Sequence, residues 1–175
     1  LGDIKIRITA KASHPEEATT MIQRVEKEIR NRLGNLIYGV DEETLQGNIT
    51  RELEKFRLTL SVVEAFTGRN ISQKLAGTSS PFFINGIVLP SEISQRQFLG
   101  LSAKDFDVLK GNSMRFVNSL AEKGRIESEV SLGLAVFGKI GEEQKRGEYR
   151  VETYYSLSTA EGIENQEHAL GGELW

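Results

Sequence analysis

The chain alternates between segments with the pattern of a β-strand and segments with the pattern of an α-helix, and this alternation limits the folds open to it. Residues 58–63 form an apolar run, which indicates a buried strand, and a turn at Thr67-Gly68 precedes a short helical segment over 69–76. The same reasoning predicts strands within 82–89, 130–137 and 149–157, and helices near 91–98, 102–110 and 113–123. Such alternation is typical of the α/β class.

The first forty residues have the pattern of a small α/β unit of their own. Isoleucine alternates with polar residues over 4–9, which predicts a strand with one buried face. Ser13 and Glu16 have the spacing of a capping box, and apolar residues then recur at helical spacing as far as Leu33. The short apolar stretch 36–40 is expected to pair beside the first strand.

A second helix and an acidic tail set the boundaries of the larger domain. Asp41 is placed to cap a helix whose apolar face ends at Phe56. The tail is polar and marked by glycines, so we expect it to be extended or docked on a neighbour. The spacing of Glu161, Glu164 and Glu167 leaves a last helix or a disordered segment as other interpretations. The predicted division is 1–46 for the small unit, 47–159 for the larger domain and 160–175 for the tail.

Composition excludes several kinds of site. The 175 residues are 38% apolar, enough for a real core, and the formal net charge of −3 argues against broad attraction to nucleic acid or anionic membrane. The absence of cysteine removes disulfides, thiolate nucleophiles and the common zinc frameworks. His14 and His168 are the two histidines, and neither has a ligand set nearby. We therefore expect a soluble cytoplasmic protein without metal, cofactor or membrane contact.

The segment 58–68 carries a family resemblance. It reads LTLSVVEAFTG and resembles the strand, turn and helix of the CinA C-terminal domain, which hydrolyses the amide of nicotinamide mononucleotide. The likeness continues through residues 77–80, 86–88 and 98–101, while 6–12 and 37–39 are similar to the KH-type middle domain of CinA proteins. The resemblance implies a small KH-like α/β unit followed by a CinA C-terminal-type α/β/α domain. It also implies a homodimer.

The departures from the family pattern fall on its catalytic positions. The nucleophilic serine of the family matches Ala65, the cysteine after it matches Phe66, and the family's tyrosine and lysine match Pro90 and Gln95. Acyl transfer from an amide needs a hydroxyl and a group that takes its proton, and neither alanine nor glutamine supplies these. We therefore assign no catalytic residue. The bulk of Phe66 and of Phe137 is expected to fill part of the family's pocket.

A ligand site without catalysis is the next hypothesis. A strand that leads through a glycine turn into a helix presents backbone N–H groups to phosphate or carboxylate, and Arg69 adds charge. The alternative is an ordinary turn, with Phe66 packed inside and Arg69 solvated. The segment 138–141 fits a GxxG pattern, although a β-turn between two strands is the favoured interpretation. The candidate ligand-binding residues are Glu64, Thr67, Gly68, Arg69, Ser79, Ser91, Gly138 and Gly141.

The sequence therefore predicts a catalytically degenerate homologue of nicotinamide-nucleotide amidase. Its role would be nucleotide-ligand binding, dimerisation or support of an N-terminal domain. One alternative is an active amidase with rearranged groups, drawn from Glu64, Thr67, Ser79 and Ser91. The other alternative is a nucleic-acid or protein-interaction module in which Lys5, Arg7 and Lys11 form the binding face, although nucleic acid is disfavoured by the net charge.

Overall fold

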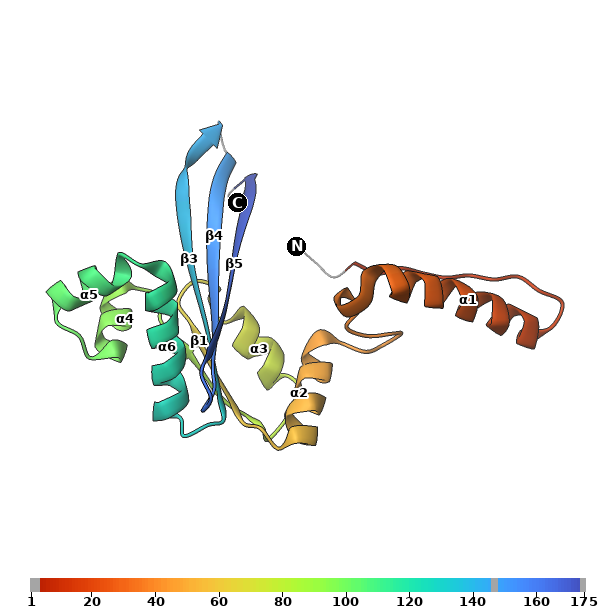
Figure 1. Cartoon of the computed structure of the whole chain (residues 1–175), viewed down its shortest axis with the longest axis horizontal. Helices are drawn as coiled ribbons and strands as arrows, with labels where there is room; N and C mark the ends of the chain where they lie inside the picture. The colour runs from red at the N-terminus through yellow and green to blue at the C-terminus, as the bar shows by residue number, and fades with distance from the viewer. Residues whose placement is uncertain (1–3, 146–147, 174–175) are drawn as a thin grey trace. The chain divides into compact units, whose positions relative to one another are not determined.

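The computed structural model describes residues 4–145 and 148–173, and the chain divides into two units between Leu45 and Gln46 (Figure 1). The second unit is built on a five-stranded sheet of order β2-β1-β3-β4-β5. The central strand β1 is parallel to both β2 and β3, while β4 and β5 follow as antiparallel strands. The strands are β1 Leu60–Glu64, β2 Phe83–Val88, β3 Leu132–Lys145, β4 Glu148–Ser158 and β5 Ile163–Glu173.

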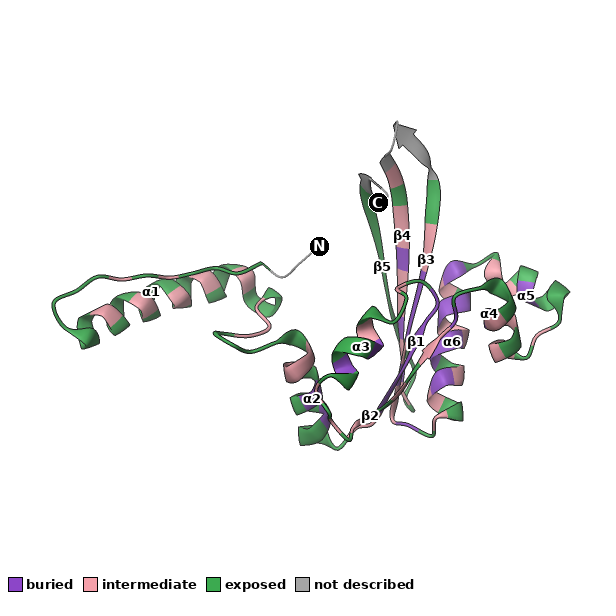
Figure 2. Cartoon of the chain, turned by 180° about the vertical axis from the view of Figure 1, so that it is seen from behind, coloured by how far each residue is buried: buried purple, intermediate pink, exposed green. Residues whose placement is uncertain are grey.

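Helices cover both faces of this sheet, which makes it an α/β/α arrangement of the class that the sequence predicts. On one face α4, α5 and α6 pack over a core that includes Val63, Phe116 and Phe137. On the other face α2 and α3 pack over a smaller core centred on Val62 and Leu75. Figure 2 shows the buried positions gathered on the strands and on α6. The helices are α2 Leu45–Phe56, α3 Asn70–Ala76, α4 Glu92–Leu99, α5 Ala103–Lys110 and α6 Ser113–Glu127.

The first unit contains α1 Pro15–Leu33 and a 3₁₀ turn η1 Gly34–Leu36, and several predictions for it are wrong. Residues 4–12 are not a strand, and residues 36–40 do not pair with them. Within the described part of this unit no second strand supplies the ladder hydrogen bonds that an alternating segment needs. None of the residues of α1 is buried, and residues 4–45, the described part of this unit, form no closed core.

The two predicted N-cap residues, Ser13 and Asp41, are also wrong. The N-cap residue of α1 is His14, which makes no side-chain capping bond, and the helix begins with Pro15. Proline suits that position because its missing N–H would have no partner in the first turn. Asp41 lies in a turn with φ of 52°, several residues before α2 begins, so it does not cap that helix.

The C-terminal third of the chain corrects one prediction and confirms another. Gly138 and Gly141 lie within β3 and not in a β-turn, because β3 continues to Lys145, and Gly138 is opposite Thr153 of β4. Residues 163–173 pair with β4 along their whole length as β5, so this part of the tail is extended, as predicted, and the alternatives of a helix or a disordered segment are wrong. Figure 1 shows β3, β4 and β5 running on past the ends of β1.

The described residues contain neither a candidate membrane span nor a candidate metal cluster. None of the helices in this part of the chain has both the length and the apolar character needed to cross a bilayer. Across the same residues, no cluster of three or more His, Asp or Glu side chains has the arrangement of a metal site.

Candidate functional site

The turn between β1 and α3 holds most of the predicted ligand-binding residues, and its central feature is a buried carboxylate. Glu64 ends β1 and is 1% exposed. Its Oε1 accepts hydrogen bonds from the Ser72 amide at 2.8 Å and the Ser72 hydroxyl at 2.5 Å. Its Oε2 accepts from the Thr67 hydroxyl at 2.5 Å and the Ile71 amide at 3.2 Å. Four donors therefore converge on one side chain.

These donors decide the charge state of Glu64. Burial by itself raises the pKa of this carboxyl, but the hydrogen bonds from Ser72, Thr67 and the amides of Ser72 and Ile71 together outweigh it and lower the pKa below its ordinary value of 4.5. The side chain is thus an anion at neutral pH. An anion that already accepts four hydrogen bonds is a poor general base, because a proton taken up would displace one of its donors.

The buried Glu64 carboxylate binds the backbone amides at the N-terminus of α3. The first amides of a helix have no partner within it and commonly hold an anion. Here the amides of Ile71 and Ser72 donate to Glu64, so they are not available to a phosphate in this conformation. Gly68 and Arg69 complete the turn with positive φ values of 63° and 81°, and the Arg69 side chain is exposed.

Ala65 points to the opposite face of the sheet from Glu64. It is 8% exposed and belongs to the core that also contains Val63, Leu89 and Phe137. Its amide donates to the carbonyl of Val136 at 2.9 Å. The side chain at the end of β1 on this face is therefore a methyl group packed among apolar side chains, with no atom that could attack a carbonyl.

Gln95 is linked to the end of β1 through hydrogen bonds of Leu89. The Leu89 amide donates to the Glu64 carbonyl at 2.9 Å, and the Leu89 carbonyl accepts from Gln95 Nε2 at 3.2 Å. Gln95 is 5% exposed, and its Oε1 has no hydrogen-bond partner among the described residues. Neither of its side-chain atoms takes up a proton near neutral pH, so the pair of Ala65 and Gln95 offers no nucleophile and no base.

The two phenylalanines expected to fill the family's pocket are placed differently. Phe137 is 4% exposed and lies in the core, with its ring centroid 4.8 Å from that of Phe116 in an edge contact. Phe66 is 39% exposed and lies over Gly138. A Cβ at Gly138 would come within 2.3 to 2.6 Å of the Phe66 ring, so only glycine accommodates this packing. The suggestion that Phe66 packs inside is therefore only half right.

The remaining candidate residues are not gathered at this turn. Ser91 caps α4, with its hydroxyl accepting from the Ser94 amide at 3.2 Å. Ser79 lies just beyond α3, which ends at Ala76, so it is at the other end of that helix from Glu64. Gly141 lies further along β3 than Gly138. Sequence reasoning missed Ser72, the main partner of Glu64, because a serine eight residues after an acidic residue is not a recognised motif.

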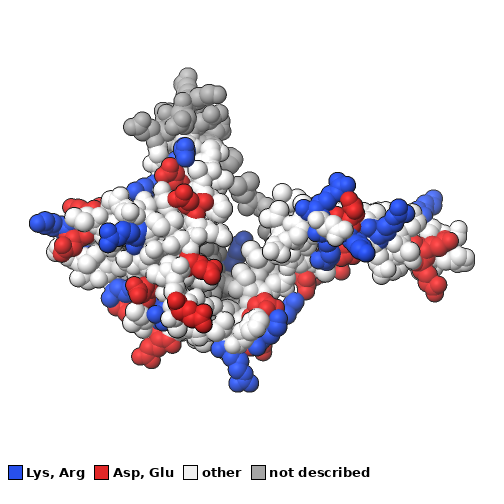
Figure 3. All heavy atoms as spheres, viewed as in Figure 1, with Lys and Arg blue, Asp and Glu red and all other residues white. Residues whose placement is uncertain are grey.

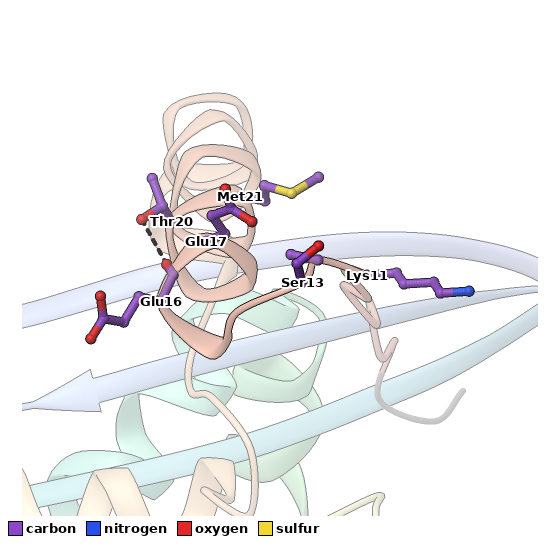
Figure 4. A pocket seen from close by; sticks show the side chains of 7 residues that line it. Lys11, Ser13, Glu16, Glu17, Thr20 and Met21 are labelled. Carbon is purple, nitrogen blue, oxygen red and sulfur yellow. Dashed lines mark hydrogen bonds between the residues drawn. The ribbon is translucent and has the colours of Figure 1, made fainter.

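A shallow hollow lies at the start of α1 in the first unit (Figure 4). In this hollow the Thr20 hydroxyl donates to the Glu16 carbonyl at 2.9 Å. Lys11, Glu16 and Glu17 are its charged residues, and all three are exposed. Two carboxylates against one amine do not favour an anionic ligand, and no buried polar group points into the hollow among the residues described. It is therefore not a candidate site.

Two family models together match nearly the whole chain. Residues 42–173 match the model of the CinA C-terminal domain, and residues 1–39 match the model of the damage-inducible protein CinA KH domain. The chain belongs to the CinA family. This assignment confirms the resemblance carried by residues 58–68.

Similar CinA-family sequences come from several bacteria. A putative competence-damage inducible protein of Desulforamulus reducens is 28% identical over 174 residues, which covers 98% of this chain and 42% of that protein. Another, from Caldanaerobacter subterraneus subsp. tengcongensis, is 33% identical over 142 residues, or 80% of this chain and 34% of that protein. The chain thus spans less than half the length of these relatives.

Solved structures of CinA superfamily proteins share the fold. A protein from Escherichia coli matches with a TM-score of 0.63 at 16% identity, covering 78% of this chain and 83% of its own. The competence damage-inducible protein A of Klebsiella pneumoniae matches with a TM-score of 0.61 at 20% identity, covering 73% of this chain and 81% of its own. At these identities the likeness concerns the CinA fold alone.

Proposed function

We propose that this chain is a catalytically degenerate CinA-family homologue of nicotinamide-nucleotide amidase that acts by binding a nucleotide ligand, by dimerisation or in support of an N-terminal domain. The observation that carries the proposal is the side chain at the end of β1. Ala65 presents a buried methyl group there, and the neighbouring Gln95 amide donates to the Leu89 carbonyl. Amide hydrolysis through an acyl-enzyme has neither a nucleophile nor a proton acceptor at this place.

The geometry gives little support to an amidase with rearranged groups. The Ser91 hydroxyl is used in the cap of α4, and Ser79 is at the far end of α3 from Glu64. The Thr67 hydroxyl donates a hydrogen bond to Glu64, which is the arrangement expected of a nucleophile and its general base. That carboxylate, however, also accepts hydrogen bonds from the amides of Ser72 and Ile71, and its lowered pKa makes it a weak proton acceptor.

The nucleic-acid alternative also lacks a supporting observation. Lys5, Arg7 and Lys11 are exposed, as a binding face requires, but the segment that carries them is not part of a sheet. On the face of the molecule shown in Figure 3, basic and acidic side chains are interspersed. Binding to a phosphate backbone is favoured by a continuous basic surface, which this mixed distribution does not provide.

Calorimetric titration with nicotinamide mononucleotide, followed by analysis of the same sample for ammonia, tests the proposal. We expect binding without release of ammonia. Hydrolysis that is lost in Ser91→Ala or Thr67→Val would support the rearranged enzyme and refute degeneracy. The absence of both binding and hydrolysis would remove the ligand-binding role and leave assembly as the function. Sedimentation of the unmodified chain tests the homodimer that we propose for this assembly.

A further inference from the structure

The outer edge of the sheet is unusually long and open. β5 is the last strand in the order β2-β1-β3-β4-β5, and its eleven residues make it about twice as long as an average strand. Every residue from Ile163 to Gly171 is exposed. The outward N–H and C=O groups of such an edge have no sheet partner, which makes it a template for another strand.

β5 has few of the features by which proteins protect an edge. Residues 163–173 contain no lysine, arginine or proline. The pairing of β4 with β5 continues from Ile163 to Glu173 without a bulge that would twist the edge away. Charged side chains (lysine above all), prolines and bulges are the usual means of preventing edge-to-edge association. Of these means β5 has only three glutamates, Glu164, Glu167 and Glu173, so a strand that covers this edge must keep other carboxylates away from them.

We propose that β5 pairs antiparallel with β5 of a second copy of this chain, across a two-fold axis at His168. The inference names the interface of the homodimer proposed above and rests on that proposal. Two antiparallel strands related by a two-fold axis place one residue opposite itself. An axis at His168 overlaps all eleven residues of β5, whereas an axis at Ala169 or beyond shortens the overlap.

The charges of β5 are compatible with this register. With the axis at His168, Glu164 lies opposite Gly172 of the second copy and Glu167 lies opposite Ala169, so no two carboxylates face each other. An axis at Glu167 would set two carboxylates directly opposite, which is destabilising. The fully overlapped pairing would form about ten backbone hydrogen bonds, since alternate residue pairs exchange two each.

The side chains of the outer sheet extend the same interface. Ile140, Val151 and Leu170 are directly opposite one another across β3, β4 and β5, and they form an apolar row that ends at the edge. Ile140 is 53% exposed and Leu170 is 49% exposed. In the proposed register Leu170 lies opposite Gln166 of the second copy. The ring centroids of Tyr155 and His168 are 5.8 Å apart. Because His168 lies on the proposed axis, the same ring pair of the second copy would lie beside this one.

A cross-linking experiment on the full chain tests the register. His168→Cys places one thiol on the axis, where opposite Cα atoms are about 4.5 to 5.5 Å apart, within the range for a disulfide. The chain has no other cysteine. Gln166→Cys, on the same face, is the control, because the two copies of residue 166 would be about 13 Å apart along the strands. We expect mild oxidation to cross-link His168→Cys and to leave Gln166→Cys uncross-linked.

Sedimentation equilibrium of charge variants supplies the second test. Leu170→Lys should weaken dimerisation at least about tenfold, and adding Gln166→Glu should restore it, because the two new charges face each other only in this register. A monomeric unmodified chain would overturn both the homodimer and the interface. A dimer in which Leu170→Lys has no effect, or in which both cysteine variants cross-link equally, would overturn the interface and leave the homodimer in place.

Discussion

Glu64→Gln is the perturbation whose outcome the structure defines most fully. The glutamine has nearly the same shape, but it replaces one acceptor oxygen with an NH₂ group and removes the negative charge. If the remaining oxygen keeps the two Ser72 donors, the NH₂ group faces the Thr67 hydroxyl and the Ile71 amide. The hydroxyl can rotate and accept a hydrogen bond, whereas the amide cannot, and it is left without a partner.

The cost of this change follows from two effects. A partly buried amide without a partner costs about 1–3 kcal/mol, and hydrogen bonds to a charged group are stronger than neutral ones by about 1 kcal/mol each. Allowing for relaxation of the turn, we expect a loss of about 2–4 kcal/mol in the free energy of unfolding. Glu122→Gln, at an exposed position on α6, is the matched control and should change stability by less than about 0.5 kcal/mol.

The pH dependence gives the same prediction an independent check. The pKa of Glu64 is lowered in the folded protein, so the unfolded chain binds more protons in the interval below the ordinary value of 4.5. The stabilisation by Glu64 is therefore fully present above that value and is lost as the pH falls through the folded pKa. Urea unfolding at pH 7 and at intervals down to pH 3 should show the difference between the unmodified chain and Glu64→Gln shrinking with acid. A variant that equals the unmodified chain at pH 7, or a constant difference across this range, would refute the reasoning.

Three further predictions follow from packing and from the catalytic positions. Gly138→Ala should cost about 1–3 kcal/mol by urea unfolding, because the added methyl collides with the Phe66 ring, and Phe66→Ala in the same chain should recover most of that loss. Leu120→Ala should cost about 2–5 kcal/mol, since this side chain is fully buried, while Val108→Ala at a 73% exposed position should cost little in the same assay. Ala65→Ser alone should release no ammonia from nicotinamide mononucleotide, because no proton acceptor accompanies the new hydroxyl, and turnover by this variant would show that a base is present.

The sequence predicts the larger domain well because its signals are local. The apolar run at 58–63, the turn at Thr67-Gly68 and the amphipathic helices from residue 92 onward are all in the structure within a few residues of their predicted places. Each of these elements buries a face that its own periodicity defines. The class of fold then follows from their order, since alternating strands and helices cover both faces of a sheet.

The errors concern elements whose state depends on a distant partner. Residues 4–9 alternate like a strand, but in the described structure nothing pairs with them. Residues 163–173 are extended as predicted, although their glutamates at helical spacing also allow a helix, and β4 decides between the two because it offers eleven residues of backbone to pair with. β-propensity depends strongly on such context, and a single segment does not contain the information about its neighbour.

The capping role of Glu64 could not be read from the sequence either, and it shows how two adjacent residues at the end of β1 serve different parts of the fold. Successive side chains of a strand point to opposite faces. At the end of β1, Glu64 therefore points to α3 and holds the start of that helix, while Ala65 points to the core under α4 and α6. Ala65 contributes a small packed methyl group to the core, and Glu64 accepts the hydrogen bonds that fix the turn. Because the two tasks fall on adjacent residues with opposite orientations, we expect a change confined to residue 65 to leave intact the turn that Glu64 maintains.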